Sequence, residues 1–156
     1  MRVFQIRLFV PLIVVCSVSY GCRFNDIAEL EEPIIKYSNT YIDKFAYSLS
    51  YNEDAEQANW IAYKLEASEL EPKFKRTKRF YVDTLILSGT AENIDYLHSG
   101  YDRGHLAPAA DMVWSEQAMS ESFSYCNISP QDPAFNRGIW KKLEVFYLRI
   151  CITMIF

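Results

Sequence analysis

Tyr101-Asp102-Arg103-Gly104-His105-Leu106-Ala107-Pro108-Ala109-Ala110-Asp111-Met112 is the stretch around which the rest of this sequence is organised. It places an acid, a guanidinium, a glycine and an imidazole at four consecutive positions. The imidazole can accept a proton near neutral pH, and the guanidinium has a planar set of donors that suits a phosphate. The proline keeps the residue before it extended, so we expect a loop leaving a strand. The alternative for so short a motif is a polar loop with a solvated histidine.

Two further blocks accompany this motif. Downstream, Asn127-Ile128-Ser129-Pro130-Gln131 precedes a segment in which Asn136 and Glu144 lie eight positions apart. Upstream, Arg76, Phe80 and Asp83 follow the spacing Arg-x-x-x-Phe-x-x-Asp. The three blocks, in this order, resemble those of the DNA/RNA non-specific endonucleases, a family of ββα-metal nucleases. The resemblance covers roughly residues 45–144.

The resemblance implies an α+β fold in which an antiparallel sheet carries a ββα-metal (His-Me finger) unit. It also implies sequence-non-specific hydrolysis of DNA and RNA that leaves 5′-phosphates, with one divalent cation, magnesium or manganese. His105 would be the general base and Asn136 the direct metal ligand. The expected supporting roles are phosphate stabilisation by Arg76 and Arg103, orientation of water on the metal by Glu144, and positioning by Asp102 and Asn127.

The 156 residues allow one domain with a sizeable core. Arg2 and Arg7 precede an apolar run over residues 8–18, which is too short to span a membrane and predicts a signal peptide over residues 1–21. The Gly21-Cys22 pair resembles a bacterial lipoprotein cleavage site, although Tyr20 fits it poorly. We therefore expect an exported protein with a lipid on Cys22; ordinary cleavage and an uncleaved anchor are the alternatives. Residues 22–41 are expected to be a linker and residues 42–156 the nuclease domain.

The other cysteines suggest little chemistry. Cys126 precedes Asn127 in an apolar run and is interpreted as a small buried residue. A disulfide between Cys126 and Cys151 is compatible with export, but two cysteines do not define a framework. No cysteine or histidine pair has the spacing of a zinc site, which disfavours a zinc hydrolase. His98, the second histidine, is expected at the surface.

Charge is uneven along the chain. Residues 23–71 hold 11 acidic and 4 basic residues, whereas residues 72–156 hold 9 acidic and 10 basic residues. An acidic protein is not a general polyanion binder, but the half that contains the motif has a cationic run with interleaved phenylalanines. A charge run is usually a solvated face; because this one directly precedes the motif, we expect it to track phosphates. Its proposed substrate-binding members are Lys73, Lys75 and Arg79.

Periodicity predicts the main elements. Residues 45–51 alternate as a strand does, and residues 59–65 are expected to pair with them. Ser115 can cap a helix through Met119, residues 123–128 are expected to form a buried strand, and residues 130–133 a turn. Asp132 can cap a second helix that starts at Pro133, on which Asn136, Trp140 and Glu144 would form one row.

The resemblance stops after Glu144. Residues 145–156 carry one charge and have high β-propensity. They are interpreted either as a short strand or as a change of sequence that truncates the family domain. We favour truncation, and therefore expect residues 23–156 to fold marginally. The alternative function is an inactive or weakly active chain that binds nucleic acid or acts as a lipid-anchored interaction protein. Substrate preference between DNA and RNA and the oligomeric state cannot be inferred.

Overall fold

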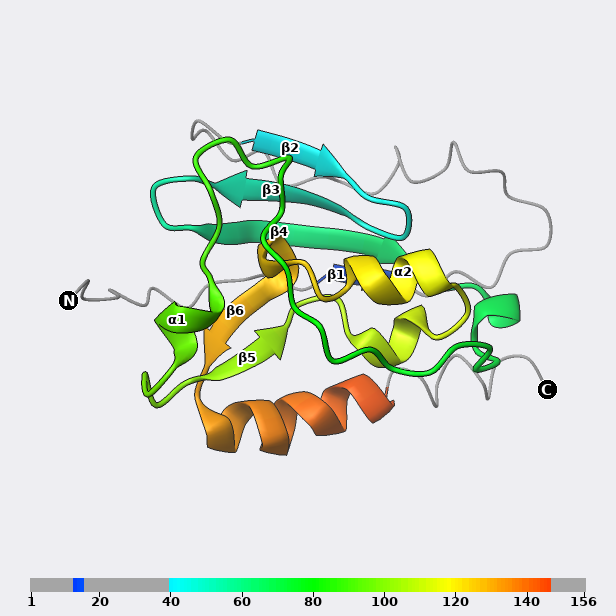
Figure 1. Ribbon diagram of the computed structural model, residues 1–156. Helices are drawn as coiled ribbons and strands as arrows, with labels where there is room; N and C mark the ends of the chain where they lie inside the picture. The colour runs from blue at the N-terminus through cyan, green and yellow to red at the C-terminus, as the bar shows by residue number, and fades with distance from the viewer. Residues whose placement is uncertain (1–12, 16–39, 147–156) are drawn as a thin grey trace.

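The computed structural model describes residues 13–15 and 40–146, which fold around two sheets (Figure 1). The larger sheet has the order β1-β4-β3-β2. Its strands are β1 (Ile13–Val15), β2 (Thr40–Asp43), β3 (Ser48–Asn52) and β4 (Gln57–Lys64). β1 runs parallel to β4, and the other pairs are antiparallel. The smaller sheet is one antiparallel pair, β5 (Asp102–His105) with β6 (Ile128–Gln131).

The antiparallel pair of β3 and β4 confirms the strands predicted from alternation, with Leu49 opposite Ile61. The first strand is shifted, since it begins at Ser48 and not at residue 45. Phe45 lies in the bend between β2 and β3, where the backbone N–H of Lys44 donates to the carbonyl of Tyr47 at 2.8 Å. β2 also begins two residues inside the predicted linker, because its pairing with β3 starts at Thr40.

Two helices have the predicted caps. α2 (Glu116–Glu121) begins after Ser115, whose hydroxyl accepts from the N–H of Ala118, and it ends two residues beyond the predicted Met119. The C-terminal helix covers residues 133–146, and the carboxylate of Asp132 accepts from the N–H groups of Ala134 and Phe135. Its middle, Phe135–Trp140, is a π-helical turn. Because this helix reaches residue 146, the short strand considered for residues 145–156 does not begin at Val145.

The predicted strand over residues 123–128 is wrong. A 3₁₀ turn occupies Tyr125–Asn127, and β6 begins only at Ile128 and includes part of the predicted turn over residues 130–133. All six residues of this segment are buried, so the apolar run is explained by its position in the core and not by strand geometry. Other short elements are the 3₁₀ turns Ala67–Glu69 and Ala109–Met112 and the helix α1 (Asn93–Tyr96), which the sequence did not predict.

The core lies between β3–β4 and the segments that follow β5. It joins Leu49, Tyr51 and Ile61 of the larger sheet to Met112 and Cys126. A smaller cluster of Ala109, Met119 and Phe123 packs beneath the motif. The larger cluster therefore holds the segment that follows β5 against the main sheet.

The predicted signal peptide and linker lie largely outside the described residues, as do Cys22 and Cys151. The three described residues of the predicted signal peptide form β1, the edge strand beside β4. Within the described ranges, no helix combines the length and the apolar character needed to cross a membrane.

Candidate active site

The Asp-Arg-Gly-His motif forms β5 itself and not a loop after a strand. Gly104 pairs with Ser129 and His105 with Ile128 in the antiparallel pair with β6. The side chain of Gln131 covers Gly104 so closely that a Cβ there would lie 2.1 Å from its Cδ. Any other residue at position 104 would have to displace the buried side chain of Gln131.

A hollow of about 480 Å³ opens beside β5 and joins five of the predicted site residues. These residues come from three separated parts of the chain: the loop before β5, β5 and the C-terminal helix. Positive charge predominates in the lining, which suits a phosphate group. The predicted residues in the lining are Arg76, Arg103, His105, Asn136 and Glu144; the additional ones are Ala109, Ala110, Arg137, Lys141 and Val145.

His105 is buried in this lining, with 7% of its surface exposed. Its ring lies 4.7 Å from that of Phe123 and 5.8 Å from that of Phe80. Among the described residues, its Nε2 has no hydrogen-bond partner. Burial, and secondarily the charge of Arg76, lowers the pKa of His105 to about 3. The imidazole is thus neutral at pH 7, which is the form that accepts a proton.

The two arginines are held on the same aromatic layer. The guanidinium of Arg76 lies 5.3 Å from the ring centre of Phe123, and that of Arg103 lies 4.5 Å from the ring centre of Phe80. Arg103 also donates to the side-chain oxygen of Asn93 in α1 at 2.6 Å. Stacking on these rings orients both cations while most of their donors remain available to a ligand.

The π-helical turn changes which side chains line the hollow. The sequence predicted a row of Asn136, Trp140 and Glu144, but the wider turn places Lys141 in the lining instead of Trp140. The indole N–H of Trp140 donates to the backbone carbonyl of His105 at 3.1 Å. The helix is therefore fastened directly to the motif strand, as is common where a π turn occurs at a functional site.

Two carboxyl groups near the hollow have raised proton affinity. Burial raises the pKa of Glu144 to about 7, with a further contribution from the charge of Asp111. Burial also raises the pKa of Asp111 to about 6, although the hydroxyl of Tyr63 donates to it at 2.6 Å. Asp111 was quoted in the motif but given no role; its burial next to other ionisable groups could not be inferred from spacing.

Asn127 fastens the loop that follows β5. Its side-chain oxygen accepts from the N–H of Ala107 at 2.8 Å, and its amide nitrogen donates to the carbonyls of Ala107 and Ser122. The residue is fully buried and does not line the hollow. Every polar atom of its amide thus holds backbone in place around the motif.

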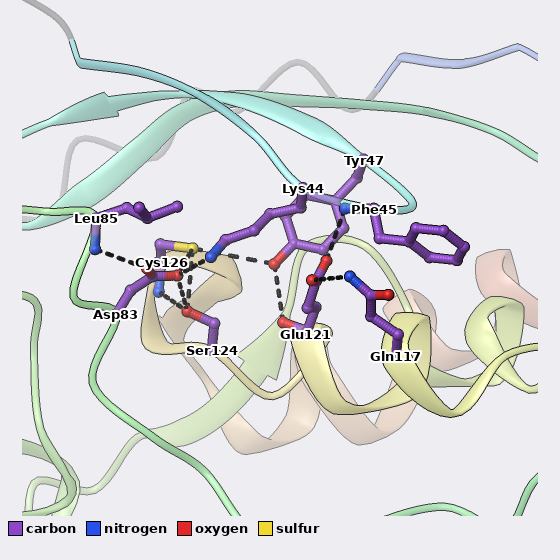
Figure 2. A network of polar contacts seen from close by, with 9 residues as sticks. All are labelled: Lys44, Phe45, Tyr47, Asp83, Leu85, Gln117, Glu121, Ser124 and Cys126. Carbon is purple, nitrogen blue, oxygen red and sulfur yellow. Dashed lines mark hydrogen bonds and ion pairs between the residues drawn. The ribbon is translucent and has the colours of Figure 1, made fainter. Parts of the chain in front are cut away.

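A buried polar network connects the segment before β5 to the larger sheet (Figure 2). The ammonium group of Lys44 lies 2.6 Å from the carboxylate of Asp83, with side-chain exposures of 8% and 2%. Ser124 donates to the same carboxylate at 2.6 Å, and Cys126 at 3.3 Å. Burial would raise the pKa of Asp83, but the hydrogen bonds from Lys44 and Ser124 keep it below its ordinary value. The network anchors Asp83, seven residues after Arg76.

Several predicted residues lie elsewhere. Lys73, Lys75 and Arg79 are exposed and do not line the hollow. Cys126 is a free, buried thiol whose pKa is raised to about 12 by burial, as expected of a packing residue. His98 is exposed, as predicted, with a left-handed backbone conformation.

The oxygen atoms that the hollow offers as ligands fit a hydrated hard cation. Asn136 uses its amide nitrogen to donate to Asp102 at 2.9 Å, and no hydrogen bond to its Oδ1 is found in the described part of the chain. Across the same residues, no group of three or more histidine, cysteine or acidic side chains could hold a metal ion. An amide oxygen with a carboxylate nearby suits magnesium, which keeps most of its waters.

Comparison with known proteins places this arrangement in a family. The sequence profile of the DNA/RNA non-specific endonucleases matches residues 30–152, and the chain belongs to that family. Its fold is that of the ββα-metal nucleases, since a solved structure, described as the EndoG/EndoGI complex in a study of EndoG inhibition, matches with a TM-score of 0.66 and 31% identity. The match covers 71% of this chain and 47% of that one.

The curated relatives are nucleases. The mitochondrial nuclease EXOG of Danio rerio is 41% identical over 100 residues, covering 63% of this chain and 29% of the relative. A nuclease of Syncephalastrum racemosum is 40% identical over 110 residues, covering 67% and 34%. Human mitochondrial endonuclease G is 35% identical over 103 residues, covering 65% and 35%. The chain thus matches about a third of the length of these relatives.

Proposed function

We propose that this protein hydrolyses phosphodiester bonds of DNA and RNA without sequence specificity, with His105 as general base and one divalent cation held by Asn136. The observation that carries the proposal is the hollow beside β5. It joins a neutral buried imidazole, one nitrogen of which has no hydrogen-bond partner among the described residues, to two stacked arginines and an amide oxygen. Family membership supports the same reaction.

In the proposed reaction, Nε2 of His105 takes a proton from the attacking water. The water oxygen forms a bond to phosphorus, and the bond to the 3′ oxygen breaks with its electron pair left on that oxygen. The 3′ oxygen then takes a proton from solvent water, so the products carry a 5′-phosphate and a 3′-hydroxyl. An imidazole with a pKa near 3 is a weak base. Burial is the larger cause of this low pKa and the charge of Arg76 the smaller one; a bound anionic phosphate would stabilise the protonated ring against both and raise that pKa toward the range in which a general base is effective.

Arg76 and Arg103 would bind the phosphate and stabilise the negative charge that grows on it. Both project from aromatic supports into the hollow, so little reorganisation is needed during the reaction. Lys73, Lys75 and Arg79 would contact phosphates outside the hollow, since they are exposed on the segment that leads to Arg76. Such contacts add affinity without reading sequence.

Asn136 would hold magnesium or manganese through its Oδ1, and Glu144 would accept hydrogen bonds from the waters of the ion. When bound, the cation would neutralise charge on the phosphate and stabilise the departing 3′ oxygen. Asp102 would keep the amide of Asn136 in the orientation that presents its oxygen to the ion. Asn127 would contribute indirectly, because its hydrogen bonds hold the backbone of the loop that follows His105.

The test is plasmid degradation by the full chain with magnesium, with chelator, and with magnesium restored after chelation. We expect reversible loss in chelator and loss of magnesium-dependent cleavage in Asn136→Ala, while Asn136→Asp keeps some activity. End-labelling of the products should reveal 5′-phosphates. Full activity in chelator would contradict the role of the cation. Binding without cleavage under all conditions would favour the alternative of an inactive nucleic-acid-binding chain.

We also propose that the protein is exported and attached to a membrane through a lipid on Cys22. The support is the charged and apolar leader followed by Gly21-Cys22. A single acylated cysteine would tether the protein to a membrane without spanning it.

A further inference from the structure

A second hollow, of about 860 Å³, lies next to the segment that supplies Arg76. Its aromatic side chains are Phe74, Tyr81 and Trp114, and its polar ones come from the start and the outer face of α2, including Glu116 and Glu121. Phe74 is 41% exposed. Aromatic surface that is open to solvent and hollowed in this way is suited to receiving a flat ring.

One chain segment, residues 74–81, supplies lining residues to both hollows. Phe74 lines the second hollow and Arg76 lines the first, and two residues of chain span at most about 7 Å. The pattern repeats at the end of the segment, where Phe80 lies against His105 and Tyr81 lines the second hollow. Residues 74–81 thus contribute side chains to both hollows, which places the second hollow close to the first along the chain.

The second hollow has fixed walls. The backbone N–H groups of Lys73 and Phe74 both donate to the carbonyl of Val113, each at 2.9 Å, and thereby hold the Phe74 segment beside Trp114. The ring of Phe45 lies 5.5 Å from that of Trp114. The backbone N–H of Phe45 and the amide of Gln117 donate to the carboxylate of Glu121 at 2.7 and 2.9 Å, as Figure 2 shows. A preorganised aromatic site loses less entropy when a ligand binds.

The charged residues of the lining are the acidic Glu116 and Glu121, and the basic residues that flank Phe74 along the chain lie outside the lining. Lys73 and Lys75 flank Phe74 and are exposed, and neither forms an ion pair with another described residue. Glu116 and Glu121 lie on the α2 side. The lysines suit a phosphate, whereas the carboxylates repel one and accept from N–H groups. A nucleotide has this arrangement, with an anionic phosphate at one end and N–H donors on the edge of its base.

Resting on the proposed function, we infer that the second hollow binds one unpaired base of a DNA or RNA strand whose neighbouring phosphodiester lies in the active site. The base stacks against Phe74 and Trp114, its N–H groups face the carboxylates of α2, and its phosphate lies at Lys73 and Lys75. A base in a duplex is stacked and paired and cannot enter the hollow. The protein therefore holds single strands by a contact that duplexes do not make.

The test measures how tightly the full chain binds a labelled single strand of about 12 nucleotides and a duplex of the same length. Chelator is present throughout to prevent cleavage. Phe74→Ala should weaken single-strand binding about 10-fold, the scale of one lost stacking contact, and change duplex binding much less. Phe74→Tyr keeps the ring and should bind as the wild type does. Leu87→Ala removes an exposed apolar side chain outside the hollow and is the control.

A second measurement needs no variant. A strand in which the bases are replaced by abasic sugars should bind the wild type about 10-fold more weakly than the intact strand. Equal binding of both strands, or an equal loss for single strand and duplex in Phe74→Ala, would overturn the inference. Magnesium-dependent duplex cleavage is measured separately, so its absence would count against the proposed function instead.

Discussion

The carboxylate of Asp102 accepts a hydrogen bond from the amide nitrogen of Asn136 at 2.9 Å. The same carboxylate binds the guanidinium of Arg137 through two hydrogen bonds, at 2.7 and 2.5 Å. The hydrogen bonds from Arg137, helped by that from Asn136, hold the pKa of Asp102 below its ordinary value. The amide of Asn136 can therefore present only its oxygen to a ligand, because its nitrogen is already engaged by a charged acceptor.

This pairing predicts the effect of Asp102→Asn. A neutral amide at position 102 no longer requires a donor from Asn136, so the orientation of the ligand oxygen is lost. Affinity for the cation should fall by about 10- to 100-fold, as for other residues that orient metal ligands. The measurements are the magnesium concentration at half-maximal cleavage and the shift of the melting temperature with manganese. Asp54→Asn removes an equivalent charge in the turn after β3 and should change neither.

His105→Ala should reduce cleavage by about 100-fold or more, because the group that accepts the proton of water is removed. Binding of nucleic acid in chelator should be retained, since both arginines remain. His98→Ala provides the matched control, because that histidine is exposed and lies outside the hollow. Similar turnover of His105→Ala and the wild type would show that another group is the base.

The buried imidazole also predicts a pH dependence of stability. In the folded state His105 has a pKa of about 3, below the ordinary value of 6.5, so between these values the unfolded chain binds more protons. Stability should fall as pH decreases through this window, by at most about 1.4 kcal/mol per pH unit from this residue. Denaturant unfolding of the wild type and of His105→Asn across the window measures it. Parallel curves for the two proteins would contradict the assignment.

The ion pair of Lys44 with Asp83 predicts a stability effect. Lys44→Ala leaves a buried carboxylate without its cation and should cost about 3 kcal/mol. Lys64→Ala removes an ion pair with Glu66, 3.1 Å long but with Glu66 52% exposed, and should cost less than about 1 kcal/mol. Both are measured by denaturant unfolding. If the two variants lost the same stability, the buried network would not be the anchor that its geometry indicates.

Lipidation predicts that labelled fatty acid is incorporated into the wild-type protein in a bacterial host and not into Cys22→Ser. The reason is that the thiol of a lipoprotein cysteine is the acceptor of the lipid. Cys126→Ser is the control, since that thiol is buried in the folded domain. Equal labelling of the wild type and Cys22→Ser would leave secretion or an uncleaved anchor as the alternatives.

The sequence predicted the elements that depend on local chemistry. The caps at Ser115 and Asp132 and the pairing of the two central strands follow from short-range rules. The segment 123–128 was predicted wrongly because a continuous apolar run is compatible with a buried strand. Periodicity cannot distinguish such a strand from another segment that is buried on all sides. The π-helical turn likewise has no pattern of its own, so the row through Trp140 was predicted from ordinary helix geometry.

The site residues were predicted from resemblance, and their partners were not. Asp102 pairs with Arg137, 35 positions away, and Lys44, in the bend between β2 and β3, pairs with Asp83. Arg103 is held by Asn93 in a segment with no periodicity. Such contacts depend on how distant elements pack, which spacing along one sequence cannot show.

The crowding of Gly104 by Gln131 has a consequence for how this sequence can change over evolutionary time. A mutation that adds a side chain at position 104 is harmful while glutamine remains at 131, and a smaller residue at 131 gives no benefit while glycine remains at 104. A route to a different pair is therefore open only if position 131 changes first, to a residue that leaves room for a side chain at position 104. The two positions lie 27 residues apart on the neighbouring strands β5 and β6, and they are therefore expected to change together.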